Sequence, residues 1–272
     1  MRDPLFDLVG RVVIVTGALG QLGSAYAAAL VERGAKVALL DRHDDISRLP
    51  APLQEACADG RALALAADVT DREALQAALR RIEARLGTPS GLIANAALDS
   101  PPNAPASENG PFEDYPVDSF RKVLDVNVTG VMLCCQVFGG AMAKAGQGSI
   151  VLIGSIYGVV SPDQSIYEYR RSEAETFFKP VAYSASKSAL YNLTRYLATY
   201  WAGRGVRVNS VTLAGVFANQ DPRFLEGYLK KMPLGRMAEP DDYVGIMVYL
   251  LSDASRYATG AEFRIDGGWT AW

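Results

Sequence analysis

The sequence is poor in the residues that most often build metal sites and disulfide frameworks. Among its 272 residues are one histidine, His43, and three cysteines, Cys57, Cys134 and Cys135. The cysteines form neither a CxxC pair nor a zinc-ligand spacing, so we expect reduced thiols in the core or at an interface. A single histidine gives little support to a histidine-based metal cluster or a serine-protease-like triad. We therefore expect no bound metal.

Three other features are missing. The formal net charge is −3, without the basic surplus that nucleic-acid binding requires. No run approaches the roughly 18 consecutive apolar residues that span a membrane. The N-terminal residues 1–7 (MRDPLFD) lack the apolar stretch of a signal peptide. These absences predict a cytoplasmic protein with no nucleic-acid and no membrane partner.

What the sequence does have is a regular alternation of short apolar runs and longer helical stretches. No repeat or linker divides the chain, and its length suits a single domain over residues 1–272. The predicted strands are 11–16, 36–40, 61–67, 91–95, 148–154, 206–213 and 261–265, and the predicted helices are 21–34, 71–86, 117–145, 182–203 and 240–251. The pattern indicates an α/β fold of the doubly wound, Rossmann type. It predicts a parallel sheet of about seven strands with helices on both faces and ligands at the carboxyl ends of the strands.

Two connections at the carboxyl edge of that sheet are unusually long. Residues 98–116 are rich in proline, serine and asparagine, and residues 156–180 are polar and aromatic. Long loops in compact domains more often serve function than not. We expect a substrate-side insertion at about residues 156–181 and a lid over residues 216–233.

A glycine-rich loop joins the first predicted strand to the first helix. Residues 16–23 read TGALGQLG, and glycines at this junction let the backbone approach a pyrophosphate while the helix N-terminus supplies amide donors. A glycine triplet alone is weak evidence, but a strand before it and a helix after it are the required context. The predicted cofactor contacts in this loop are Gly17, Leu19, Gln21, Leu22 and Gly23.

The end of the second strand predicts which dinucleotide binds. Asp41 stands 18 residues after Gly23, where a carboxylate accepts hydrogen bonds from the adenosine ribose and repels a 2′-phosphate. Arg42 favours the opposite preference, since a basic residue there can accommodate the 2′-phosphate of NADP. We expect NAD, with NADP the less favoured cofactor. Further contacts are expected from Asp68 and Val69 at the adenine, from Asn95, Ala96 and Ala97 near the nicotinamide half, and from Val216.

Tyr183 and Lys187 form the candidate catalytic pair. They lie four residues apart at the start of a long helix and so share one face. A nearby ammonium favours the phenolate, which predicts a lowered pKa for Tyr183. The tyrosine could then exchange a proton with a substrate oxygen while hydride moves to or from nicotinamide. Both residues are also expected to contact the cofactor, with Lys187 at the nicotinamide ribose.

Two further residues extend this pair. Ser155 follows the fifth strand at the carboxyl edge, where its hydroxyl could hold the substrate oxygen beside Tyr183. Asn127 lies inside a predicted helix, where asparagine is unfavourable and tends to have a specific role. We expect Asn127 to bend the helix or to hold a water, and its functional interpretation is a proton relay next to Lys187. Alone, a serine after a strand is usually a cap, and YxxxK is usually an exposed helix pair.

Together these motifs resemble the short-chain dehydrogenase/reductase family from Arg11 to about Gly268. The matching segments are VNVTG at 126–130, GS at 154–155, YSASK at 183–187, RVNSV at 207–211 and IDGG at 265–268. The resemblance implies a catalytic tetrad of Asn127, Ser155, Tyr183 and Lys187. It also implies a homotetramer or dimer assembled through the two long helices and the C-terminal strand, with residues 267–272 near such an interface.

The sequence departs from the family pattern at three places. Gln21 stands where the family's single-domain members have a glycine, a spacing that resembles the extended members acting on nucleotide sugars. Ala214 replaces the usual proline before Gly215. Ser155 and Tyr183 are 28 residues apart, farther than is usual, so the insertion between them should project near the active site.

Three functions are compatible with these features. The first is an NAD(H)-dependent oxidoreductase that interconverts an alcohol and a carbonyl on a small polar substrate such as a sugar derivative. The second is a nucleotide-sugar epimerase or dehydratase with tightly bound NAD, which the glycine spacing favours. The third is a dinucleotide sensor without turnover, which an intact tetrad disfavours.

Overall fold

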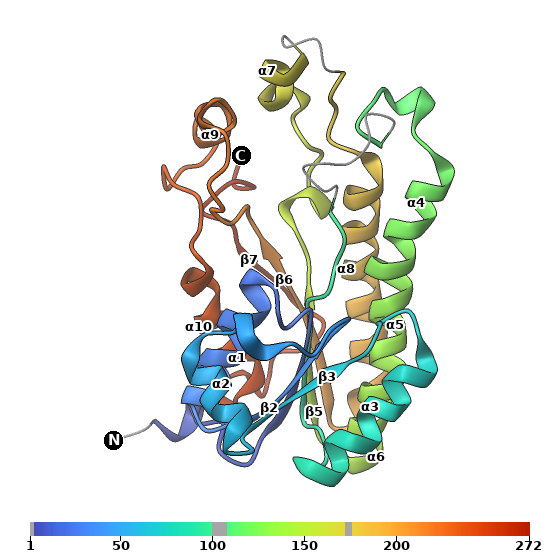
Figure 1. The fold of residues 1–272 in the computed structure, drawn as a ribbon, viewed down its shortest axis with the longest axis vertical. Coiled ribbons are helices and arrows are strands. Elements are labelled where there is room, and N and C mark those ends of the chain that lie inside the picture. Colours follow the sequence, from blue (N-terminus) through green and yellow to red (C-terminus); the bar gives the residue numbers. More distant parts are fainter. Residues whose placement is uncertain (1–2, 100–107, 172–175) are drawn as a thin grey trace.

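The computed structural model describes residues 3–99, 108–171 and 176–272. Its centre is a parallel sheet of seven strands in the order β3-β2-β1-β4-β5-β6-β7 (Figure 1). The strands are β1 (Val12–Thr16), β2 (Lys36–Asp41), β3 (Ala62–Ala66), β4 (Gly91–Ala94), β5 (Gly148–Ile153), β6 (Val206–Leu213) and β7 (Glu262–Ile265). Each strand lies within one residue of its predicted ends, and the doubly wound fold is confirmed. The order reverses between β1 and β4, which opens a crevice at their carboxyl ends.

Helices cover both faces of the sheet (Figure 1). On one face lie α1 (Gln21–Glu32), α2 (Ala51–Ala58) and α10 (Val244–Leu251), and on the other lie α3 (Arg72–Arg85), the α4–α6 stretch and α8 (Val181–Trp201). Their apolar sides bury two clusters against the strands, which is the main source of stability in such a fold. We did not predict α2, because it is short and begins next to two prolines, Pro50 and Pro52.

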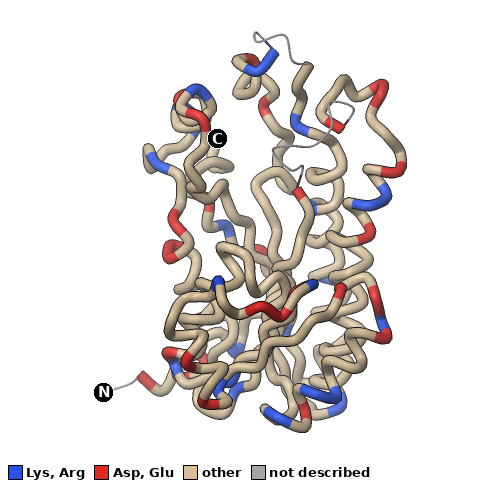
Figure 2. Tube along the Cα trace, viewed as in Figure 1, with Lys and Arg blue, Asp and Glu red and all other residues tan. Residues whose placement is uncertain are grey.

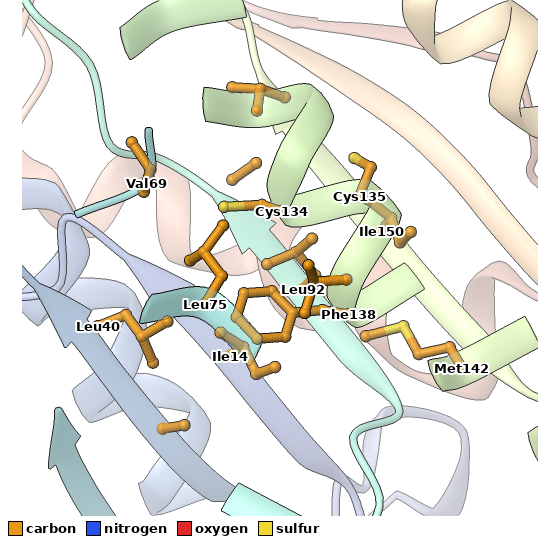
Figure 3. Close-up of a cluster of buried hydrophobic side chains, with 14 of the residues drawn as sticks. Ile14, Leu40, Val69, Leu75, Leu92, Cys134, Cys135, Phe138, Met142 and Ile150 are labelled. Atoms are coloured by element: carbon orange, nitrogen blue, oxygen red, sulfur yellow. The ribbon is translucent and has the colours of Figure 1, made fainter. Parts of the chain in front are cut away.

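The predicted helix over 117–145 is one continuous stretch with two π-helical turns. It comprises α4 (Val117–Leu124), α5 (Val131–Cys134) and α6 (Gly140–Ala145), separated by π segments at Asp125–Gly130 and Cys135–Gly139. By length and composition this stretch could cross a membrane. Its side chains instead form the core: Figure 3 shows Phe138 between Leu92 and Ile14 of the sheet, and Phe138 is 0% exposed. It is the core helix of the domain.

A third hydrophobic cluster lies beyond the carboxyl edge of the sheet. It joins the predicted insertion, which contains 3-10 turns at Ile156–Gly158 and Gln164–Tyr167 and the short α7 (Glu168–Arg171), to α9 (Pro222–Leu229). Figure 1 shows α7 and α9 projecting past the strand ends. The predicted lid therefore contains a helix, which starts at a capping aspartate, Asp221, followed by Pro222.

Charged residues of both signs are mixed over the outside of the molecule. In the view of Figure 2, Lys and Arg alternate with Asp and Glu along the outer helices. This distribution agrees with the near-neutral net charge of −3.

Candidate active site

A cavity of about 1100 Å³ lies at the carboxyl ends of the strands and extends under α9 and the insertion. Of the predicted site residues, its wall contains Gly17, Gln21, Leu22, Asp41, Arg42, Asp68, Val69, Asn95, Ala96, Ala97, Ser155, Tyr183, Lys187 and Val216. The cavity thus joins most of the predicted cofactor contacts to the predicted catalytic residues. Leu19, Gly23 and Asn127 are not in its wall and act on it through neighbours.

The glycine loop has the tight geometry that its sequence predicts. Gly17 has a φ of +64°, and a Cβ there would lie 3.0 Å from both the Ala96 Cα and the Asn95 Nδ2. A Cβ on Gly23 would lie 2.1 Å from the Gly17 carbonyl oxygen. Helix α1 begins at Gln21 after Gly20, which has no side chain to cap it. Its first amides are therefore suited to a phosphate, and the loop fits a dinucleotide.

Asn95 holds the loop from the neighbouring strand. Its backbone N–H donates to the Thr16 Oγ1 at 3.0 Å, and its Nδ2 donates to the Thr16 carbonyl oxygen at 3.0 Å. The Ala96 N–H donates to the same Thr16 hydroxyl at 3.0 Å. We predicted Asn95 as a wall of the nicotinamide half. Its side chain also braces the β1–α1 turn.

Asp41 faces the cavity from the end of β2. Its Oδ2 accepts from the Leu19 N–H at 3.0 Å, and its Oδ1 accepts from the Arg42 N–H at 2.8 Å. A carboxylate has about four lone-pair sites, so two amide donors leave room for ribose hydroxyls. Leu19 therefore orients the Asp41 carboxylate through its backbone N–H. Asp68, which accepts from Thr70 at 2.9 Å and 2.8 Å, has a lowered pKa because of these bonds and the nearby Arg42.

Tyr183 and Lys187 lie side by side in the first turns of α8. The Lys187 Nζ is 5.7 Å from the centroid of the Tyr183 ring and donates to the Ile153 carbonyl oxygen at 2.8 Å. Helix α8 starts after Pro180, which ends the insertion and fixes the position of this first turn. Both residues reach the cavity, Lys187 from a buried position and Tyr183 with part of its ring exposed.

The pKa of Tyr183 shifts in the direction opposite to our prediction. Burial of the hydroxyl raises the pKa, the negative charge of Asp99 raises it further, and a hydrogen bond with Ser155 opposes them. Burial also lowers the pKa of Lys187 to about 8. Desolvation penalises both charged forms. It outweighs the attraction that a close tyrosine–lysine pair suggests.

Ser155 is held rigidly by Tyr191, a residue that we did not predict. The Tyr191 hydroxyl donates to the Ser155 carbonyl oxygen at 2.8 Å, accepts from the Ser155 N–H at 3.3 Å and contacts the Thr212 Oγ1 at 2.8 Å. Gly154 leaves room for this ring, since a Cβ there would lie 2.7 Å from the Tyr191 hydroxyl. The Ser155 Oγ accepts from the Tyr157 N–H at 3.2 Å.

Asn127 lies behind the cavity, in the first π-helical turn. Its Oδ1 accepts from the Leu98 N–H at 2.7 Å, and its Nδ2 donates to the Leu98 carbonyl oxygen at 2.8 Å and to the Ser186 Oγ at 2.9 Å. Its side chain thus fastens the loop after β4 to helix α8. On helix α8 its side chain contacts Ser186, the residue before Lys187. The helix is π-helical at Asn127, where we expected a bend.

The wall around the substrate end contains Tyr167, which we expected near the active site as part of the insertion. It also contains five residues that the sequence did not single out: Asp99, Tyr157, Lys179, Phe224 and Tyr228. The aromatic ones belong to the third cluster, in which Tyr167 and Phe224 have ring centroids 5.7 Å apart. The aromatic content of the insertion was the available signal. Which of its rings face inward depends on contacts with α9, which lies far away in the sequence.

The chain matches known proteins over nearly its whole length. A family model described as enoyl-(acyl carrier protein) reductase matches residues 17–270. The chain is 33% identical over 269 residues to cis-4-hydroxycyclohexanecarboxylate dehydrogenase of Sinomonas cyclohexanicum, covering 96% of this chain and 97% of that protein. It is 34% identical over 276 residues to galactitol 2-dehydrogenase (L-tagatose-forming) of Cereibacter sphaeroides, covering 98% of each.

Solved structures agree with these relatives. A short-chain dehydrogenase of Leptospira borgpetersenii with bound NAD⁺ has a TM-score of 0.84 and 31% identity, covering 99% of this chain and 96% of that chain. A Beutenbergia cavernae protein assigned as an NAD(P)-dependent gluconate 5-dehydrogenase, with NADP at low occupancy, has a TM-score of 0.82 and 32% identity, covering 98% and 100%. Matches of this length and identity turn the resemblance of the motifs into membership: the chain belongs to the short-chain dehydrogenase/reductase family of nicotinamide-dependent enzymes, and its relatives support an alcohol/carbonyl oxidoreductase.

Proposed function

We propose that this enzyme is an NAD(H)-dependent dehydrogenase/reductase acting on a small polyhydroxy substrate. The observation that carries the proposal is that one cavity joins the carboxylate of Asp41 and the glycine loop to Ser155, Tyr183 and Lys187. A cavity of this size can hold a dinucleotide and a small substrate together.

The preference for NAD rests on Asp41. Its carboxylate is oriented by two backbone amides at the end of β2, and a negative charge fixed there repels a 2′-phosphate. Arg42 also lines the cavity, and after the two hydrogen bonds from Thr70 its charge makes a smaller contribution to the lowered pKa of Asp68. We therefore assign the adenosine end to NAD.

A nicotinamide ring bound here would accept or supply the hydride. The protein's part is the proton: the Tyr183 hydroxyl donates it to a carbonyl oxygen in reduction and accepts it from an alcohol in oxidation. Since burial raises the pKa of Tyr183, its phenol is the dominant form and is suited to donate. Oxidation requires the phenolate, which the Lys187 ammonium stabilises while it remains charged.

Ser155 orients the substrate oxygen. Tyr191 fixes its backbone on both sides, so the serine hydroxyl keeps one position next to Tyr183. Asn127 aligns α8 with the β4 loop through Ser186 and Leu98. We propose that this fastening, rather than direct contact with Lys187, is how Asn127 supports the proton relay.

The substrate class is supported by the relatives and by the wall of the cavity. One relative is named for galactitol, and phenolic hydroxyls of Tyr157 and Tyr167 lie 3.4 Å apart at the substrate end. Phenols both donate and accept hydrogen bonds, which suits a molecule rich in hydroxyl groups. The insertion at about 156–181 would then determine which alcohol is oxidised.

The test is turnover of a polyol panel containing galactitol, threitol and glycerol, with NAD and NADP compared in parallel. We expect reduced NAD to form with at least one polyol and NADP to react more slowly. The proposal would be contradicted if no polyol is oxidised and if cyclohexanol, other secondary alcohols and the corresponding ketones also show no turnover.

The glycine spacing keeps one alternative testable, a nucleotide-sugar epimerase or dehydratase that retains NAD. Gln21, which causes this spacing, donates to the Phe217 carbonyl oxygen at 2.9 Å and so ties the glycine loop to the segment after β6. Purified protein that keeps stoichiometric NAD through gel filtration supports this alternative. Protein that loses its cofactor supports the dehydrogenase.

We propose a single-domain homotetramer that works in a reducing, cytoplasmic compartment. On helix α8 the rings of Tyr196 and Tyr200 stack with their centroids 5.9 Å apart, and the two residues are 60% and 54% exposed. They form an apolar surface that a second copy would cover. Trp269 packs on Tyr228 within the chain, at 4.4 Å between centroids, so Trp272 is the C-terminal aromatic left for an interface. Light scattering measures the assembly, and a monomer would contradict it.

A further inference from the structure

An ion pair lies at the substrate end of the cavity, beside the catalytic tyrosine. The Lys179 Nζ is 2.6 Å and 2.7 Å from the two carboxylate oxygens of Asp99. The same Nζ is 5.4 Å from the centroid of the Tyr183 ring, and both members of the pair line the cavity. A substrate whose reacting oxygen meets Tyr183 would therefore bring its neighbouring substituents to this pair.

The insertion holds Lys179 in place. The Gln164 Oε1 accepts from the Lys179 N–H at 2.8 Å, and the Gln164 Nε2 donates to the Lys179 carbonyl oxygen at 3.1 Å. Arg171 in turn donates to the Gln164 carbonyl oxygen at 3.2 Å and to the Phe177 carbonyl oxygen at 3.3 Å. These contacts fix the backbone from which the side chain reaches Asp99. The lysine side chain is 11% exposed, so a substrate would meet an already ordered group.

The charge of the pair predicts what it can bind. Because Asp99 already neutralises the ammonium, the pair presents a donor and an acceptor side by side with little net charge. A substrate hydroxyl can accept from the ammonium and donate to the carboxylate. A substrate carboxylate finds the ammonium already paired and a like charge next to it. Water partly screens that repulsion, because the Asp99 side chain is 50% exposed, but the substrate carboxylate meets no unpaired cation at this pair.

We propose that the Lys179–Asp99 pair selects substrates with uncharged hydroxyl groups beside the reacting carbon and discriminates against the corresponding sugar acids. The inference rests on the proposed alcohol oxidation and narrows its substrate class to neutral polyols. It gives the insertion a specific task, which is to place one cation where a carboxylate already neutralises it.

Two variants separate the roles of the pair. Asp99→Asn keeps the size of the side chain and frees the ammonium, so it should raise kcat/KM for acids and lower the polyol-to-acid ratio by about tenfold or more. Lys179→Gln removes the cation and leaves the carboxylate, so it should weaken polyol oxidation without any gain for acids. Glu226→Gln is the matched control, because it breaks the exposed 2.9 Å pair with Lys230 on α9, outside the cavity wall.

The experiment measures kcat/KM for galactitol against galactonate and for threitol against threonate, with cyclohexanol as a substrate that lacks further hydroxyls. NADH titration first establishes that each variant binds cofactor like the wild type and is folded. We expect a wild-type preference for the polyols, a collapsed or reversed preference in Asp99→Asn, and wild-type ratios in Glu226→Gln.

Two results would overturn the inference alone: a wild type that prefers the acids, or an unchanged ratio in Asp99→Asn while cyclohexanol and the polyols are oxidised. A wild type that oxidises none of the alcohols contradicts the proposed function, and this inference falls with it.

Discussion

The cofactor half and the substrate half of the cavity are built in different ways. The cofactor half consists of strand ends and a glycine turn, and its contacts run through backbone groups, as between Asp41 and the Leu19 N–H. The substrate half consists of side chains from the insertion and α9, such as Tyr167, which packs against Phe177 at 5.3 Å and Phe224 at 5.7 Å. The first is local geometry and the second is long-range packing. Substitutions in the two halves should therefore separate cofactor binding from substrate chemistry.

The largest effect is expected where the two halves meet, at Tyr183. Tyr183→Phe removes the proton donor and acceptor, so kcat should fall by about 10²–10⁴-fold while NADH affinity stays near the wild-type value. Steady-state kinetics and NADH fluorescence measure the two quantities. Tyr257→Phe, at a fully exposed side chain outside the cavity wall, is the control. Turnover that survives Tyr183→Phe would mean another group carries the proton.

Within the cofactor half, Gly23→Ala should be the most damaging change. The new Cβ would lie 2.1 Å from the Gly17 carbonyl oxygen, so the turn must open, at a cost of about 1–3 kcal/mol and with loss of NADH binding. Gly140→Ala is the matched control because its Cβ meets nothing within 4 Å, and it should be neutral or stabilising by up to about 1 kcal/mol. Thermal unfolding and NADH titration compare them. Equal behaviour of the two variants would show that the turn is not tight.

Protonation of the catalytic pair predicts opposite pH dependences for the two reaction directions. Because burial raises the pKa of Tyr183, the phenolate fraction should rise by about tenfold per pH unit below that pKa. Alcohol oxidation should therefore accelerate from pH 6 to about 8, above which Lys187 loses the charge that stabilises the phenolate, while carbonyl reduction should not accelerate. Initial rates in both directions measure this. Oxidation that is independent of pH over this range would contradict the assignment.

Lys187 predicts a change of stability above pH 8. Its pKa is lowered to about 8 in the folded protein, so above pH 8 the folded state has released a proton that the unfolded chain still holds. The unfolded state binds more protons there, and the contribution of Lys187 to stability must rise with pH from about 8 toward its ordinary pKa. Urea titrations give the free energy of unfolding at each pH, and the difference between the wild type and Lys187→Met isolates this contribution. A difference that is flat or falls between pH 8 and 10 would be inconsistent with a buried lysine.

Smaller effects should distinguish positioning in each half. Tyr191→Phe removes the hydroxyl that holds both backbone groups of Ser155, so kcat should fall about tenfold with NADH affinity unchanged.

Asp41→Ala should affect cofactor binding instead. It should narrow the preference for NAD over NADP by about tenfold at an unchanged polyol KM, and Asp44→Ala is its control. Dissociation constants and kcat measured for all three variants settle both points. If the wild type binds NADP more tightly than NAD, Arg42 rather than Asp41 determines the cofactor preference.

The sequence predicted the strand ends and the glycine turn that line the cavity, and it placed the proposed catalytic residues in the same wall, because short-range rules govern these features. Their catalytic roles stay predictions. Strands of continuous apolar residues mark a parallel sheet, glycines at a strand–helix junction mark a phosphate turn, and a four-residue spacing places Tyr183 and Lys187 on one helix face. The fold, the family and the enzyme class followed. The pKa direction of Tyr183 did not, because it depends on burial, which only the packed structure contains.

The substrate half could be predicted in position but not in composition. The separation of Ser155 and Tyr183 indicated an insertion at the active site, yet the positions of Lys179 and Tyr167 depend on contacts that span the insertion and α9. Tyr191 escaped prediction for the same reason. Only the folded chain brings its hydroxyl under Ser155, in the space that Gly154 leaves. The helix α2 was missed for lack of length, and α9 was expected only as a lid.

The most direct test of the central claim follows the hydrogen itself. Wild-type enzyme is mixed with NAD and a polyol deuterated at its oxidisable carbon, and the reduced cofactor is analysed by mass spectrometry. We expect one deuterium on the nicotinamide ring in the wild type and almost no labelled cofactor with Tyr183→Phe. Product that forms while the released cofactor stays oxidised and unlabelled, or labelling of equal rate in Tyr183→Phe, would contradict it.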